Sequence, residues 1–152
     1  MSKQMRFEGV MDRQCELLLR FLAREGVQFA LVCPISEVTF MPPLPEEMVK
    51  GFQPHSLFVL AGYTLDSLEI LSDGICFEAG FGKENIGHFV SVDFRHILQV
   101  VITTPKGKDI PLFTRMDSSE LFEVGGVKDE VMQSVEAILS NPHNQKYLLK
   151  RV

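Results

Sequence analysis

In the segment FEAGFGKENIGHFVSV, residues Phe77 to Val92, three glycines lie between two alternating segments, and this arrangement indicates the type of fold. Apolar side chains occur at every second position on both sides of these glycines. A period of two residues is typical of β-strands with one buried face. The stretch therefore predicts a hairpin. Gly80 and Gly82 leave its backbone bare, which permits a bulge or the close approach of another chain.

A glycine-rich loop can also hold a phosphate group, and GFGKENIG (residues 80–87) superficially fits that description. The segment lacks the Gly-Lys-Ser/Thr ending that brings a lysine and a hydroxyl to phosphate and magnesium. A strand pattern, and not a helical one, follows it. We therefore favour the hairpin over a phosphate site.

An amphipathic helix is predicted over residues 7–25, because its apolar residues recur at spacings of three and four. Charged residues take the opposite side, and Gly26 supplies a C-terminal stop. Leu17 and Leu19 widen the apolar arc beyond half of the circumference. Such a helix needs two surfaces to pack on, and we expect these to be its own sheet and a second subunit.

Short strands with turn residues between them are predicted over residues 27–116. Asp73-Gly74 is a tight-turn dipeptide between two of these strands. Prolines in the segment 42–54 predict a loop there, since proline removes backbone donors. A helical period returns from Asp129 and is broken at Asn141-Pro142, so residues 129–152 are predicted to form a C-terminal helix and a tail. This order predicts a single domain, residues 1–152, of the α+β and mostly β class, built as a small barrel or strongly bent sheet.

Composition narrows the classes of protein. A net charge of −5 argues against a nucleic-acid binder, which usually presents a basic face. No apolar run approaches the roughly 20 residues that span a membrane, and the N-terminus has no apolar segment of a secretory signal. The three cysteines are odd in number and widely spaced, which is typical of reduced thiols in the cytoplasm.

No pattern of residues predicts catalysis or a metal site. The histidines form no metal-ligand spacing with cysteines or carboxylates; they are His55, His88, His96 and His143. The cysteines fall on the apolar helix face or inside strands and are expected to be buried, inert thiols; they are Cys15, Cys33 and Cys76. We expect a protein that is not an enzyme and that uses neither a metal nor a cofactor.

The order of these segments resembles that of the stringent starvation protein B (SspB) family, the substrate-delivery adaptors of the ClpXP protease. Four residues match the F-x-A-x-F-G core of that family: Phe77, Ala79, Phe81 and Gly82. The triplets 68–70 (LEI) and 90–92 (VSV) match two further motifs. The resemblance covers about residues 10–115 of the chain.

The resemblance implies an SspB-like (Sm-like) small bent β-barrel behind the N-terminal amphipathic helix, here with an added C-terminal helix. It also implies a homodimer that forms through the N-terminal helix. The residues expected at that interface are Val10, Met11, Leu17, Leu18 and Phe21.

The function implied by the resemblance is that of a cytoplasmic peptide-binding adaptor, which binds degradation-tag peptides and delivers the tagged proteins to ClpXP. The residues expected to bind the peptide are Leu60, Ala61, Gly62, Phe77, Ala79, Gly80, Phe81 and Gly82. Gly80 and Val59 stand where the family has an arginine and an asparagine. The family's acidic linker is missing, and the final residues have the composition of its ClpX-docking tail but not its order; they are Leu148, Leu149, Lys150, Arg151 and Val152.

Two other functions stay open at this point. The domain could be a dimeric interaction module whose groove is closed by the helix predicted around Val131–Leu139. It could also be a small RNA-binding Sm-like barrel, which requires a contiguous basic surface that the net acidity disfavours. Neither membrane binding nor nucleic-acid binding is expected.

Overall fold

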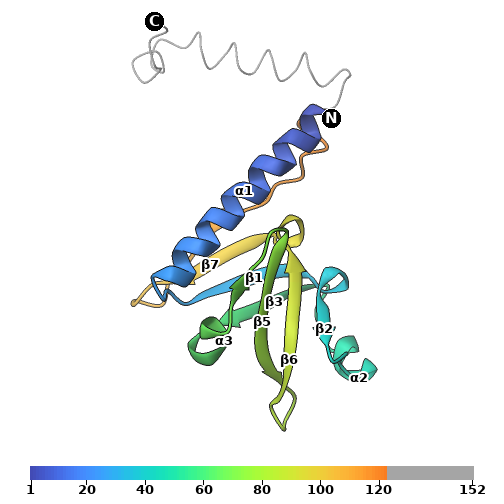
Figure 1. The fold of residues 1–152 in the computed structure, drawn as a ribbon, viewed down its shortest axis with the longest axis vertical. Coiled ribbons are helices and arrows are strands. Elements are labelled where there is room, and N and C mark those ends of the chain that lie inside the picture. The colour runs from blue at the N-terminus through green and yellow to red at the C-terminus, as the bar shows by residue number, and fades with distance from the viewer. Residues whose placement is uncertain (123–152) are drawn as a thin grey trace, which may run out of the picture. The chain divides into compact units, whose positions relative to one another are not determined.

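A computed structural model of the chain describes residues 1–122 and divides the chain into two compact units, Met1–Ser118 and Ser119–Val152. The first unit is a mixed α+β fold (Figure 1). Its elements are, in order, α1 (Lys3–Arg24), β1 (Phe29–Pro34), the 3-10 turn η1 (Ile35–Glu37), β2 (Thr39–Met41), α2 (Glu46–Lys50), β3 (His55–Leu60), α3 (Gly62–Asp66), β4 (Glu69–Ile70), β5 (Gly74–Phe81), β6 (Ile86–Asp93), the 3-10 turn η2 (Phe94–His96), β7 (Gln99–Thr103) and β8 (Asp109–Thr114).

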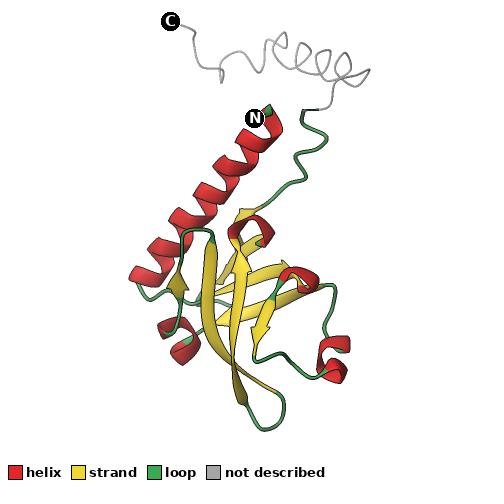
Figure 2. Ribbon diagram, turned by 45° about the vertical axis from the view of Figure 1, so that its right-hand side comes forward, coloured by secondary structure: helices red, strands yellow, loops and turns green. Residues whose placement is uncertain are grey.

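The described strands form two antiparallel sheets of four strands each (Figure 2). One sheet has the order β3-β1-β7-β8 and the other β2-β6-β5-β4. The hairpin predicted around the glycines is confirmed: β5 and β6 pair without interruption from Gly74 opposite Asp93 to Phe81 opposite Ile86. The Asp73-Gly74 turn is confirmed as well, with Gly74 at the start of β5.

Helix α1 begins at Lys3, four residues before the predicted start. The apolar pattern begins only at Phe7, but the Ser2 side chain accepts a hydrogen bond from the Met5 backbone N–H and caps the helix earlier. The helix ends at Arg24, and Gly26 follows with a φ of +66°. None of the helices within residues 1–122 is long and apolar enough to cross a membrane.

The hydrophobic core combines residues from α1 and from the inner faces of both sheets. On the hairpin, Ile75, Phe77, Val90 and Val92 are buried, as the alternating pattern predicts. The other sheet contributes Leu31, Leu60 and Val100, and α1 contributes Cys15, Leu19 and Leu22. Because α1 lies across one end of the sheets (Figure 1), its apolar stripe closes that end of the core.

The thiols follow the prediction at two of three positions. Cys15 and Cys33 are fully buried, and loss of solvent raises the pKa of each to about 12, so neither forms a thiolate at neutral pH. Cys76 is only half-buried, which corrects the expectation of a buried thiol. Its side chain points to the outer face of the second sheet, because on β5 the neighbouring Ile75 and Phe77 take the inner face.

The segment predicted as a proline-rich loop contains the short helix α2 (Glu46–Lys50). Pro45 precedes this helix at a position where the missing N–H costs nothing, and Glu46 and Glu47 lie in its first turn. The proline pattern therefore marked the start of a helix as well as the loops around it.

Arg115 follows the last strand, β8, and its side chain bonds to the first helix, α1. Its guanidinium lies 3.0 Å from Glu8 Oε2 and 2.8 Å from Asp12 Oδ1, both on α1. It also donates to the backbone carbonyls of Phe94 and Ile97. The Arg115 side chain is only 7% exposed, so this network replaces the solvent that its charge has lost. Ser118 donates a further hydrogen bond to Glu8.

Candidate functional site

Part of the outer edge of β5 has no strand beside it. The neighbouring strand β4 has two residues, which pair with Ile75 and Cys76. Beyond them, the Glu78 backbone N–H donates to Ser67 Oγ at 2.9 Å, so the Glu78 peptide groups point away from β6. Backbone direction alternates from one residue to the next in an antiparallel ladder. The N–H and C=O of Gly80 therefore point to the same edge, where no strand of residues 1–122 pairs with them.

Helix α3 borders this edge and is bonded to it. The Tyr63 hydroxyl donates to Glu78 Oε2 at 2.7 Å, and Ser67, just after α3, holds the Glu78 N–H. Tyr63 is nevertheless 67% exposed, so its ring is fixed beside the edge and remains open to solvent. The bond to Glu78 and the negative charge of Glu78 together raise the pKa of the Tyr63 hydroxyl.

The raised pKa gives the first testable prediction. In a Tyr147→Phe background, which leaves Tyr63 as the one tyrosine, the ultraviolet absorbance of the ionising phenol should have its midpoint above about pH 10. Glu78→Gln removes the charge and should lower the midpoint toward the ordinary value. Because the folded-state pKa is raised, the bond stabilises the fold below pH 10 and is lost as the pH rises through that pKa. Equal midpoints in the two proteins would contradict the hydrogen bond.

A pocket with aromatic and methionine side chains in its wall, and Glu47 beside them, lies at the far end of the same strand. It has a volume of about 400 Å³ and is lined by Glu47, Met48, Gly51, Phe52, Phe81 and Gly82. The Phe81 ring is held by neighbouring rings, with centroid distances of 5.5 Å to Phe40 and 6.3 Å to Phe52. The wall of the pocket therefore includes well-packed aromatic side chains, and the pocket can receive an apolar side chain of a ligand.

Gly82 is suited to this position for two reasons. Its φ is +77°, which other residues rarely adopt, and a β-carbon there would lie 3.1 Å from the Met48 methyl group. Gly80, two residues earlier, is exposed, but a side chain there would meet the Asn85 amide. The two glycines thus keep both the strand edge and the pocket rim free of side chains.

The residues expected from the resemblance to bind a peptide fall into two groups. Leu60 and Phe77 are core residues, 0% and 2% exposed, so their side chains lie out of reach of a ligand on the surface. The other members lie at or near the open edge and the pocket: Ala61 and Gly62 where α3 begins, and Ala79, Gly80, Phe81 and Gly82 along β5 and its turn. Ala79 is half-buried and packs against the core.

Four further residues of this region were missed by sequence reasoning: Tyr63, Ser67, Met48 and Phe52. Tyr63 and Ser67 reach the edge only because α3 folds back onto β5, and no periodic pattern indicates this. Met48 and Phe52 are four residues apart, which is the spacing of neighbours on a helix and could have indicated α2.

The residues expected at a dimer interface lie on α1. Val10, Leu17 and Phe21 are exposed by 53%, 52% and 48%, whereas Met11 and Leu18 pack partly against the core. Dimer formation through this helix stays a prediction. The predicted docking tail, Leu148 to Val152, and the predicted helix around Val131–Leu139 lie outside the described residues.

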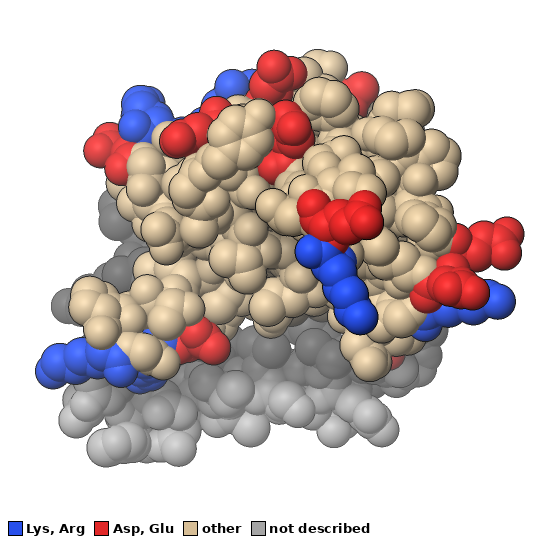
Figure 3. All heavy atoms as spheres, turned by 90° about the horizontal axis from the view of Figure 1, so that it is seen from below, with Lys and Arg blue, Asp and Glu red and all other residues tan. Residues whose placement is uncertain are grey.

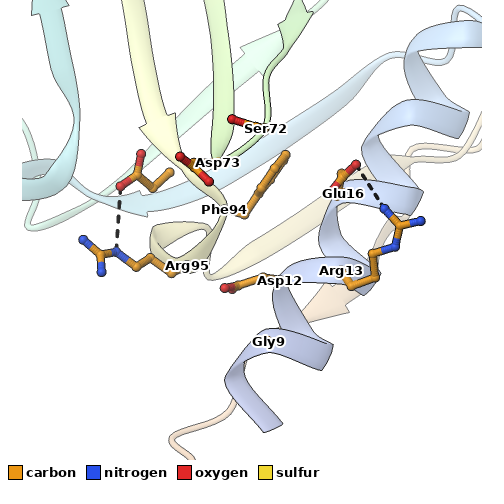
Figure 4. Close-up of a pocket in the computed structure, with 9 residues that line it drawn as sticks. Gly9, Asp12, Arg13, Glu16, Ser72, Asp73, Phe94 and Arg95 are labelled. Atoms are coloured by element: carbon orange, nitrogen blue, oxygen red, sulfur yellow. Dashed lines mark hydrogen bonds and ion pairs between the residues drawn. The ribbon is translucent and has the colours of Figure 1, made fainter. Parts of the chain in front are cut away.

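A second hollow, of about 520 Å³, is charged (Figure 4). It lies between α1, the turn that precedes β5 and η2, and its carboxylates are Asp12, Glu16, Asp73 and Asp93. Among these carboxylates, Glu16 forms ion pairs with Arg20 at 2.9 Å and with Arg13 at 3.2 Å. The hydrogen bond from Arg20, followed by the charge of Arg13, lowers the pKa of Glu16. Within residues 1–122 there is no group of three acidic, histidine or cysteine side chains that could hold a metal ion.

Charge on the side toward which the β5–β6 hairpin points is mixed (Figure 3). Acidic and basic side chains are interspersed there, and most of this face is uncharged.

Comparisons of the chain with protein-family models, with curated protein sequences and with solved structures found no match. The candidate site is therefore defined by its geometry: an open strand edge at Gly80, an aromatic ring at Tyr63, and a pocket at Phe81 and Gly82.

Proposed function

We propose that this domain is a non-enzymatic peptide-binding adaptor, in which the two sheets form a small bent barrel of the SspB-like type. It would bind a degradation-tag peptide and deliver the tagged protein to ClpXP in the cytoplasm. The observation that carries the proposal is the open edge of β5, where Gly80 presents a backbone donor and a backbone acceptor without a side chain in front of them.

An extended peptide adds to such an edge as one more strand. Its main chain bonds to the Gly80 N–H and C=O, and alternate side chains turn toward the two faces of the sheet. The pocket beside Phe81 and Phe52, at the end of the same strand, can receive an apolar side chain from a more distant part of the peptide. A side chain directed outward lies near the Tyr63 ring. Backbone bonding supplies affinity for any extended segment, and the pocket selects for an apolar residue.

The electrostatics of the site fit a peptide better than a nucleic acid. Binding to RNA depends on several lysines or arginines that neutralise phosphates. The site residues carry no such cluster: Glu78 and Glu47 are acidic, and the remaining site residues are uncharged. The net charge of −5 acts in the same direction.

A proline substitution tests strand addition directly. Gly80→Pro removes the N–H that would bond to the peptide but takes no hydrogen bond from the β5–β6 ladder, because this N–H points away from β6. Gly80→Ala is the matched control, since it adds the same β-carbon near Asn85 but keeps the N–H. In fluorescence anisotropy with a labelled degradation-tag peptide, Gly80→Pro should bind about tenfold more weakly than Gly80→Ala.

Equal affinities of the two variants would exclude Gly80 as a pairing site. No saturable binding to the unsubstituted protein up to about 100 µM, a free energy weaker than about −5.5 kcal/mol, would reject tag recognition. Circular dichroism of both variants shows whether the fold is retained.

A further inference from the structure

The four outer strands of the two sheets differ in how their edges are protected against pairing with another chain. Proteins shield such edges with charges, prolines, bulges or very short strands. β2 has three residues and β4 has two. β8 carries Asp109 and Pro111, and its pairing with β7 shifts register at Val100/Val101. Each of these edges has at least one protective feature.

The edge strand β3 has none of these features. Its six residues, HSLFVL, include no acidic residue, lysine, arginine or proline, and its pairing with β1 shows no shift in register. β3 pairs with β1 alone among the strands of residues 1–122. An edge that is long, regular and uncharged invites another strand.

The direction of the free backbone groups follows from one hydrogen bond. The Ile35 N–H donates to the Pro54 carbonyl at 2.9 Å, in line with the β1–β3 register. Counting by twos from Pro54, the peptide groups of Ser56, Phe58 and Leu60 face β1. Those of His55, Leu57 and Val59 therefore face outward, away from the sheet.

The side chains of the same strand leave apolar surface open. Leu57 and Val59 are 60% and 61% exposed on the outer face, where Ala30 and Val101 of the adjacent strands join them in a shallow hollow of about 290 Å³. Hence the outward-facing backbone groups and the exposed apolar side chains belong to the same residues.

We infer that β3 is the interface with a second copy of this chain, paired antiparallel about a two-fold axis at Leu57. In this register Leu57 lies opposite Leu57 of the second copy, and His55 lies opposite its Val59. All three outward-facing residues then find partners, which gives six backbone hydrogen bonds. The two sheets join into one continuous sheet, and Leu57 of each copy covers its counterpart.

A second copy fits this edge better than an unrelated peptide does. The outward-facing groups are placed symmetrically about Leu57, so the strand is complementary to itself without an offset. The absence of charge on the strand means that self-pairing sets no like charges opposite each other. The inference is independent of the proposed peptide site, because it uses a different edge and a different sheet.

Charge substitution at the two-fold axis tests the pairing. Size-exclusion chromatography with light scattering at about 100 µM should give the full chain a mass about twice its 17.2 kDa. Leu57→Lys and Leu57→Glu should each give monomers, because like charges then meet across the axis. An equimolar mixture of the two variants should restore the dimer. Leu112→Lys, at an exposed position on β8, is the matched control and should remain dimeric.

Three results would overturn the inference: a monomeric unsubstituted chain, a Leu57→Lys variant that stays dimeric, and a mixture that stays monomeric. If Leu57→Lys stays dimeric and Leu17→Glu is monomeric, the interface lies on α1. Loss of tag-peptide binding in Leu57→Lys without loss of the dimer would show that β3 receives a peptide instead.

Discussion

Replacing Phe77 with alanine is expected to lower the free energy of unfolding by about 3–5 kcal/mol. The ring is 2% exposed and lies between the sheets, with its centroid 6.2 Å from that of Phe58. Its removal leaves a cavity that neighbouring side chains on two paired sheets cannot fill without moving the backbone. Urea denaturation followed by fluorescence or circular dichroism measures the loss.

The matched control is Phe89→Ala on the same hairpin. Phe89 is 53% exposed on the outer face, so its loss should cost about 1 kcal/mol or less. The comparison also bears on function, because Phe77 belongs to the motif that resembles a peptide-binding strand. If Phe77→Ala kept its stability but lost peptide binding, the ring would belong to a groove and not to the core.

Arg115→Ala should lower the free energy of unfolding by about 2–3 kcal/mol. The substitution removes a buried cation and leaves the Phe94 and Ile97 carbonyls without the guanidinium donor. The loss is smaller than for a fully buried ion pair, because Glu8 and Asp12 are about one-third exposed and water can reach them. Thermal or urea denaturation of the variant measures it.

Two other substitutions separate charge from geometry at this position. Arg115→Lys keeps the charge but cannot hold four acceptors at once, so its stability should lie between those of the alanine variant and the natural protein. Arg95→Ala removes an exposed arginine that lies 3.8 Å from Asp93, and it should change stability by less than about 0.5 kcal/mol. An Arg115→Ala loss no greater than that of Arg95→Ala would show that the network does not stabilise the fold.

The parts of the fold that could be predicted from the sequence are the helix, the strands and the turn that depend on residues close together in the chain. The helical period of α1 and the two-residue period of β5 and β6 each reflect a single face that meets the core, so the buried side of each could be predicted. The turn at Asp73-Gly74 depends on neighbouring residues alone and was also predicted.

Long-range arrangement could not be predicted from these patterns. The apolar run SLFVLAGY predicted a strand, but residues of both faces are apolar there, so nothing indicated that Leu57 and Val59 face outward. The open edge at Gly80 depends on where β4 stops and on the bond from Glu78 to Ser67. Both are properties of the folded chain, and the amino-acid types at 67 and 80 do not encode them.

The bonds from Arg115 to the first helix also depend on the order in which protein synthesis makes the residues. Glu8 and Asp12 are separated from Arg115 by 107 and 103 positions, so the ribosome makes the helix long before the cation that holds it. A nascent chain that has just completed β8 already contains every described strand but not this residue. The hydrogen bonds and ion pairs between Arg115 and the first helix can therefore form only after the last strand of the sheet has been made.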